Sequence, residues 1–148
     1  MLTKKYFLLI TILMTASSMV TGCRGAGKQA YDMAPMEEMP AEVHAAPKVV
    51  QEAYQFAAAN QDVLEKLPCY CGCGGMGHTS NYACYVAEEN ADGSLNYDGH
   101  ALGCSICVDI TRDAMRMLDD GKTIDEIYTY VDFTYSQFGP SNFPDAGE

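Results

Sequence analysis

Six cysteines and two histidines are concentrated in one stretch of the chain, which opens with the hexapeptide Pro-Cys-Tyr-Cys-Gly-Cys at residues 68–73. Thiolate and imidazole are ligands that zinc(II) and copper(I) accept in proteins. The sequence therefore predicts a metal site. Its candidate ligands are Cys69, Cys71, Cys73, His78, Cys84, His100, Cys104 and Cys107.

The spacing of these residues favours metal binding over disulfides. Cysteines separated by a single residue are poorly placed to bridge each other, because a disulfide requires a particular Cα separation and torsion. The glycines of residues 72–77 let the chain wrap tightly, and Cys104 and Cys107 share one face of a predicted helix. Eight ligands match two tetrahedral zinc sites, for example Cys₃His twice, and close thiolates also suit Cu(I).

Two other interpretations stay open. An even number of cysteines in an exported protein is typical of disulfides, and would make the domain a structural, disulfide-stapled surface module. A C-x-x-C at a helix start, here Cys104 and Cys107, is typical of thiol-disulfide exchange. Covalent haem needs histidine directly after this motif, and residue 108 is Val108. We find no nucleophile and base pair or paired carboxylates, so the expected protein is not an enzyme.

The N-terminus predicts export and membrane attachment. Residues 1–22 contain Lys4 and Lys5, then an apolar run, then small residues up to Cys23, which is the order of a signal peptide. The small residues before Cys23 resemble a bacterial lipobox, which implies that this cysteine carries a diacylglyceryl group. We expect an extracytoplasmic location on the cell membrane, held by a lipid anchor.

The charge of the chain argues against nucleic acid as a partner. The whole chain has 9 basic and 20 acidic residues and a net charge of −11. Removal of residues 1–22 takes away two lysines and no acid, so the mature charge is 7 minus 20, or −13. Such a chain repels phosphates. Which protein the chain works with is not indicated by the sequence.

Composition divides the mature chain into three parts. Residues 23–46, rich in Ala, Gly, Met, Glu and Pro, are expected to be the lipidated cysteine and a disordered tether, and residues 141–148 a flexible tail. Residues 47–140 form the predicted cysteine-rich domain. Within the tether, the thioethers at residues 33, 36 and 39, with His44 nearby, offer a transient copper-collecting segment as a further hypothesis.

The fold class predicted for the domain is mainly α: a small helical domain with a Gly/Cys-rich loop. Apolar residues recur at helical spacing after Pro47, from Cys104 to Leu118, and from Ile124 to Tyr135. Gly121 is placed to end the second of these helices, and residues 123–126 are a capping box that opens the third. The tyrosines and the methionines at 115 and 117 are expected to fill core or surface.

The hexapeptide at residues 68–73 resembles the motif that names the PCYCGC lipoprotein family, largely from Gram-positive and related bacteria. The likeness covers most of residues 47–137, including the first helix, Gly77-His78, Cys84, His100 and the Cys104–Cys107 pair. The resemblance implies a shared location and cysteine site, and no reaction.

The last third is also similar, with low specificity, to the thiol-reducing cytochrome c maturation proteins, small helical bundles with C-x-x-C near a helix. The likeness rests on Cys104-Ser105-Ile106-Cys107, the following helix, and residues 121–139. It implies a thiol-disulfide or cytochrome-assembly accessory as the alternative function. This chain differs in having four further cysteines that the cytochrome c maturation proteins do not need.

Overall fold

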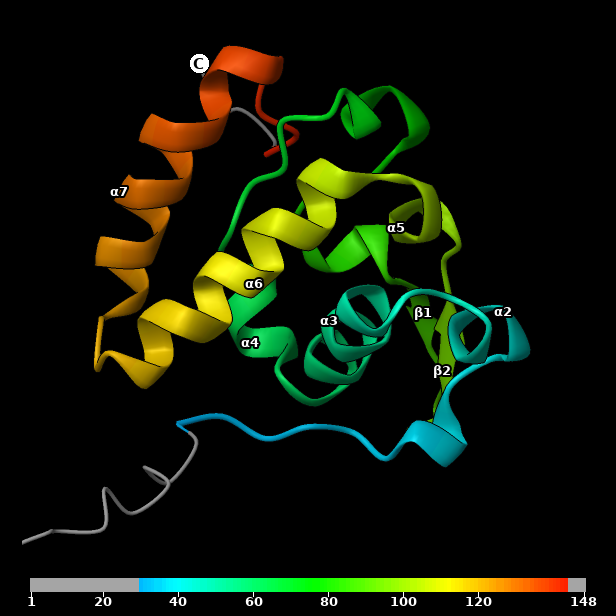
Figure 1. The fold of residues 1–148 in the computed structure, drawn as a ribbon. Coiled ribbons are helices and arrows are strands. Elements are labelled where there is room, and N and C mark those ends of the chain that lie inside the picture. The colour runs from blue at the N-terminus through cyan, green and yellow to red at the C-terminus, as the bar shows by residue number, and fades with distance from the viewer. Residues whose placement is uncertain (1–29, 144–148) are drawn as a thin grey trace, which may run out of the picture.

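The computed structural model describes residues 30–143 (Figure 1). The predicted signal peptide and Cys23 lie outside these residues. The described part is mainly α, as predicted, with one small hairpin. Its helices are α2 (Ala41–His44), α3 (Lys48–Ala59), α4 (Gln61–Leu64), α5 (His100–Gly103), α6 (Ser105–Asp119) and α7 (Ile124–Tyr135), and its strands are β1 (Val86–Glu89) and β2 (Leu95–Tyr97). Short 3₁₀ turns cover Met36–Glu38, Cys73–Met76, Tyr82–Cys84 and Ser136–Phe138.

The three longest helices form the core. Helix α6 packs against α3 on one side and against α7 on the other (Figure 1). Each helix contributes a stripe of buried apolar side chains, as the helical spacing predicted. Phe56 of α3, Ile110 of α6 and Ile127 of α7 are completely buried. The same core cluster includes Cys69, Cys73 and Cys84.

The predicted helix ends are confirmed in detail. The side chain of Thr123 accepts a hydrogen bond from the backbone N–H of Glu126, and the Glu126 carboxylate accepts one from the backbone N–H of Thr123. At the C-terminal end of α6, the N–H of Gly121 donates to the carbonyl of Leu118, and that of Lys122 donates to the carbonyl of Met117. Such caps satisfy backbone groups that a helix end otherwise leaves unpaired.

The sequence missed the β1–β2 hairpin and α5. The two strands pair in antiparallel register, with Glu89 opposite Leu95, around a polar turn at Asp92-Gly93. Elements of three or four residues give no readable periodicity, which explains the omission. At the hairpin base, the N–H of Asp98 donates to the carbonyl of Tyr85 at 2.8 Å. The hairpin thereby brings the segments that carry Cys84 and His100 side by side.

The folded part begins earlier than the sequence predicted. Residues 30–46, assigned to the tether, pack along α3: the backbone of Ala34 pairs with Gln55, and the ring of Tyr31 meets Phe56 edge-on at 5.0 Å. Val43 is completely buried and Met39 is 5% exposed. Because Met39 is buried in the core, its thioether is not free to collect copper, which weakens the hypothesis of a copper-collecting segment.

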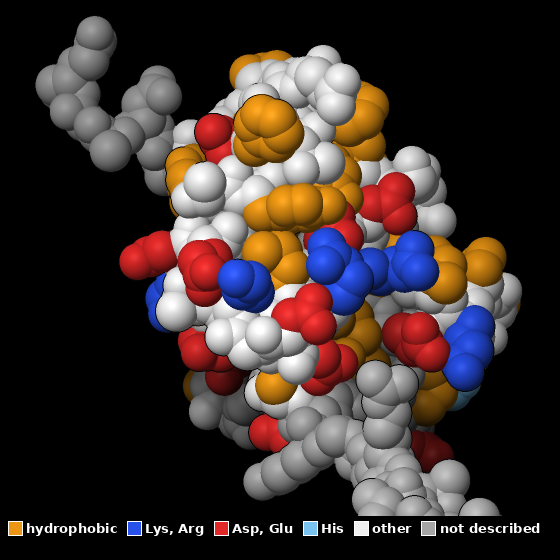
Figure 2. All heavy atoms as spheres, turned by 60° about the vertical axis from the view of Figure 1, so that its left-hand side comes forward, with side chains coloured by type: hydrophobic (Ala, Val, Ile, Leu, Met, Phe, Trp, Pro, Cys, Tyr) orange, Lys and Arg blue, Asp and Glu red, His pale blue; other side chains and the backbone are white. Residues whose placement is uncertain are grey.

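Some acidic side chains on the surface form ion pairs with basic ones. On the face drawn in Figure 2, basic and acidic side chains are interleaved, with hydrophobic side chains exposed between them. Along α6, Arg116 lies 3.0 Å from Asp113 and 3.8 Å from Asp120. On α7, Phe133 is 86% exposed, so part of this apolar surface is unburied. In the range 30–143, no helix combines the length and the apolar character that crossing a membrane requires.

Candidate metal centre

The cysteine loop is shaped by glycine. Cys69 and Cys71 lie on an irregular segment after α4, with a bend at Cys71, and Cys73 begins a short 3₁₀ turn. Gly72 and Gly77 flank that turn with φ of 84° and 91°, a left-handed conformation that residues with a Cβ rarely adopt. The sulfurs of Cys69 and Cys71 lie against Cys107, in the first turn of α6, and that of Cys73 lies against Cys84.

The thiols converge without bonding to one another. The Cys69 sulfur lies 3.4 Å from that of Cys71 and 3.3 Å from that of Cys107, and the Cys71 and Cys107 sulfurs are 3.6 Å apart. Cys73 and Cys84 face each other at 3.6 Å. A disulfide would need about 2.05 Å. No disulfide forms among the six cysteines of residues 30–143.

All eight predicted ligands come together, in overlapping groups whose donor atoms lie within 4.8 Å of one another. One group combines Cys71, His100, Cys104 and Cys107, and another combines Cys73, His78, Cys84 and His100. Cys69 lies near both, since it forms further groups with Cys71 and Cys73 and with Cys84 and Cys107. These groups could hold a metal ion.

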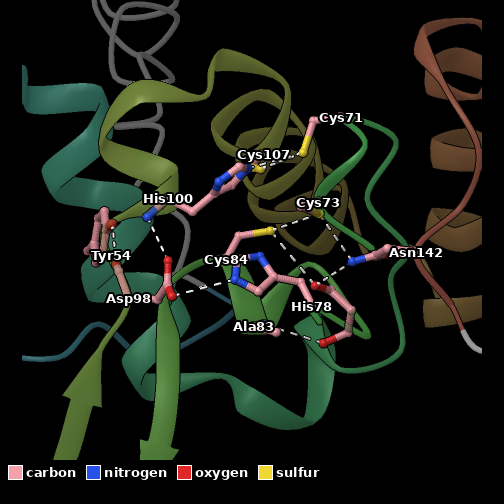
Figure 3. A network of polar contacts seen from close by, with 11 residues as sticks. Tyr54, Cys71, Cys73, His78, Ala83, Cys84, Asp98, His100, Cys107 and Asn142 are labelled. Atoms are coloured by element: carbon pink, nitrogen blue, oxygen red, sulfur yellow. Dashed lines mark hydrogen bonds and ion pairs between the residues drawn. The ribbon is translucent and has the colours of Figure 1, made fainter. Parts of the chain in front are cut away.

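His78 is held by a carboxylate and has a free nitrogen. Its Nε2 lies 3.5 Å from Oδ2 of Asp98, and Oδ1 of the same carboxylate accepts the backbone N–H of His100 at 2.7 Å. The side chain of His78 is 10% exposed, and its Nδ1 is buried with no hydrogen-bond partner among residues 30–143. Figure 3 shows the ring between Asp98 and the sulfur of Cys84. Metal-binding histidines show this arrangement, one nitrogen on a carboxylate and the other on the ion.

A buried polar network fixes the first turn of α6. The Cys107 carbonyl accepts hydrogen bonds from the Tyr85 hydroxyl at 2.9 Å and the Asn81 amide at 3.3 Å. Thr111 links the two donors, since it bonds both Tyr85 and Asn81. Asn81, Tyr85 and Thr111 are all completely buried. The helix that carries Cys107 is thus tied to the segment that carries Cys84.

Asn142 is a residue of the site that the sequence missed, because it lies in the segment assigned to the tail. Its Oδ1 accepts the Cys69 N–H at 2.6 Å, and its backbone N–H donates to the Cys69 carbonyl at 3.0 Å. Its amide nitrogen donates to the Cys73 sulfur at 3.4 Å and to the Ser80 carbonyl at 3.0 Å. Asn142 therefore clamps the cysteine loop. Nothing in a single sequence signals a contact between such distant residues.

The thiols differ in acidity. Hydrogen bonds from Cys107 and Cys84 lower the pKa of Cys69 well below its ordinary value. Burial raises the pKa of Cys71 and of Cys73, and the charge on Cys69 raises both further. The hydrogen bond to Cys69 raises the pKa of Cys107. A metal ion that binds the cluster must displace the protons of these thiols.

Comparison with known proteins gives one match. A family model described as "Protein of unknown function with PCYCGC motif" matches residues 15–144, which include the whole cysteine loop and both histidines of the site. No curated protein matches the chain. No solved structure matches it either. The description assigns no reaction or ligand, so the function must be argued from the site.

Proposed function

The chain belongs to the PCYCGC family, and we propose that it is a non-catalytic protein that binds a thiophilic metal ion, copper(I) or zinc(II). The proposed ligands are the six clustered cysteines with His78 and His100. The proposal goes beyond the observation that Cys/His groups here could hold an ion. It assigns the ion to a chemical class and makes its retention the role of the domain.

The observation that carries the proposal is the unpartnered Nδ1 of His78. A buried polar atom without a hydrogen bond destabilises the fold by about 1–3 kcal/mol, so such atoms are rare unless they have another role. His78 belongs to the group of Cys73, His78, Cys84 and His100, and Asp98 contacts its Nε2, the other nitrogen of the ring. A metal ion bound at Nδ1 would remove the penalty.

The sulfur distances support both proposed metals. Tetrahedral zinc with Zn–S bonds of about 2.3 Å separates its sulfurs by about 3.8 Å. The spacings of 3.3–3.6 Å between the thiols require only a small expansion to reach that value. The histidines favour zinc, whereas the excess of soft thiolates favours copper(I). The metal content of the purified protein decides between them.

We also propose that the protein acts at the extracytoplasmic face of the membrane, anchored through a lipid on Cys23. The support is the sequence pattern of residues 1–23 alone. A Cys23→Ser chain should move from the detergent phase to the aqueous phase in a detergent partition of whole cells. A Cys23→Ser chain that stays in the detergent phase would contradict lipid anchoring.

The test of metal binding is native mass spectrometry of the full chain, purified anaerobically in detergent. This measurement counts retained metal and free thiols together, and elemental analysis identifies the metal. The expected result is stoichiometric copper or zinc with all six cluster cysteines reduced. The matched control is Ser105→Ala, between Cys104 and Cys107, which should retain the same metal.

Two other results would replace the proposal. No metal with all six thiols in disulfides would support the structural, disulfide-stapled module. A single reducible bridge between Cys104 and Cys107, together with a mixed disulfide trapped when one of the two is replaced, would support the thiol-disulfide accessory. The geometry favours neither, because the Cys107 sulfur contacts Cys69 and Cys71 at 3.3 and 3.6 Å.

A further inference from the structure

The number of donors in the cluster exceeds the needs of one ion. A tetrahedral ion takes four ligands, and the cluster has eight. Two four-membered groups define two sides of the cluster. Cys71, Cys104 and Cys107 occur only in the first of these groups, and Cys73, His78 and Cys84 only in the second. Two residues, Cys69 and His100, lie close to both sides. Their position decides how the eight donors divide.

His100 can be assigned to one side by a distance, and Cys69 by the number of ligands that remain. Nε2 of His100 lies 3.3 Å from the Cys71 sulfur, which places His100 with Cys71, Cys104 and Cys107. We name these four residues the outer set. Cys69 lies 3.3 Å from the Cys107 sulfur and 3.4 Å from the Cys71 sulfur, and also within 4.8 Å of Cys73 and Cys84. Because His100 already gives the outer set its four ligands, Cys69 is the donor left to complete the other four. The inner set is therefore Cys69, Cys73, His78 and Cys84. Each set has three thiols and one imidazole.

The two sets differ in burial. Cys69, Cys73 and Cys84 are at most 1% exposed, and His78 is 8% exposed. In the outer set only Cys107 is buried, while Cys71, His100 and Cys104 are half-buried. An incoming ligand can reach the outer set and not the inner one.

The two sets also differ in the contacts that orient their ligand side chains. Asp98 holds His78, and the Asn142 amide donates to Cys73. The Cys84 sulfur lies 3.9 Å from the Ser80 carbonyl. Groups that orient the ligands in this way commonly change metal affinity by about 10–100-fold. An ion in the inner set is thus held by oriented, buried ligands.

We propose that the cluster holds two ions at once, an inner ion that is retained and an outer ion that exchanges with a thiol-bearing partner through Cys71 and Cys104. This inference rests on the proposed metal binding and deepens it. Exchange proceeds by ligand substitution: a partner thiolate binds the outer ion as Cys71 or Cys104 leaves, with no change of oxidation state. The inner ion keeps the loop folded while the outer one moves.

The experiment loads the reduced full chain with Zn²⁺ and counts bound ions by native mass spectrometry during challenge with EDTA. The expected result is two ions per chain, one of which leaves at least about tenfold faster than the other. Cys104→Ser should bind one ion, the slow one, and Ser105→Ala should bind both. Cadmium NMR of the unsubstituted chain adds a measurement that needs no variant, with two resonances of which one disappears first under EDTA.

Three results would overturn the two-ion arrangement and leave metal binding intact. They are one ion per chain, two ions that leave at a single rate, and loss of the slow ion in Cys104→Ser. A chain that binds no zinc, cadmium or copper(I) at all, with its thiols reduced, would overturn the proposed function itself.

Discussion

Asp98 contacts His78 from the side opposite the thiols, with 3.5 Å between Oδ2 of the carboxylate and Nε2 of the ring. This contact selects the tautomer of His78. A carboxylate only accepts hydrogen bonds, so Nε2 must carry the proton and Nδ1 must be free to bind an ion.

Asp98→Asn should weaken zinc binding by the inner set by about 10–100-fold. The new amide can still accept the His100 N–H while its NH₂ group faces Nε2, which forces Nε2 to accept and Nδ1 to carry the proton. Competition titration with a zinc chelator measures the change. Asp62→Asn, at an exposed position of α4, is the matched control and should leave the affinity unchanged. Equal affinities for the Asp98→Asn and Asp62→Asn chains would contradict the role of Asp98.

A truncation pair should reveal the clamp made by Asn142. A chain ending at Pro140 loses the four hydrogen bonds that Asn142 makes to Cys69, Cys73 and Ser80. We expect it to lose about 1–3 kcal/mol of unfolding free energy in the reduced, metal-free state, since the buried partners are left unpaired. Urea unfolding measures this loss. A chain ending at Phe143 keeps the clamp and should match the full chain; equal stability of both truncations would show that the clamp is unimportant.

The sequence predicted the parts of the fold that depend on local pattern. The helices of residues 48–59, 105–119 and 124–135, the capping box at Thr123 and the clustering of cysteines with histidines were all readable from spacing. It missed what depends on distant contacts. Asn142 bonds Cys69 across the whole domain, and Met39 is buried only because the rest of the core packs around it. Such tertiary contacts leave no periodicity in a single chain.

Gly139 should be intolerant of any side chain. A Cβ at this position would lie 2.8 Å from the carbonyl oxygen of Tyr70, which is backbone and cannot swing away. Gly139→Ala should therefore push the C-terminal segment off the cysteine loop and destabilise the protein by about 1–3 kcal/mol. Thermal unfolding of the reduced chain measures the effect. Gly75→Ala is the control, because a Cβ there meets no atom within 4 Å. Similar losses of stability in Gly139→Ala and Gly75→Ala would show that the contact with the Tyr70 carbonyl is not the cause.

The capping box of α7 should make stability depend on pH in the acidic range. The Thr123 N–H lowers the pKa of Glu126 below 4.5, and Lys122 lowers it further. Because the pKa is lower in the folded state, this contribution is present above about pH 4.5 and is lost as the pH falls through the lowered value.

Glu126→Gln keeps an acceptor for the Thr123 N–H but has no charge to titrate. Its unfolding free energy, measured by urea at a series of pH values, should fall less steeply below about pH 4.5 than that of the unsubstituted chain. Thr123→Ala should lose about 1 kcal/mol at neutral pH, since it removes the acceptor for the Glu126 N–H. Parallel pH curves for the Gln variant and the unsubstituted chain would show that Glu126 acts only as a hydrogen-bond acceptor, because a neutral amide then supports the helix end as well as a carboxylate does.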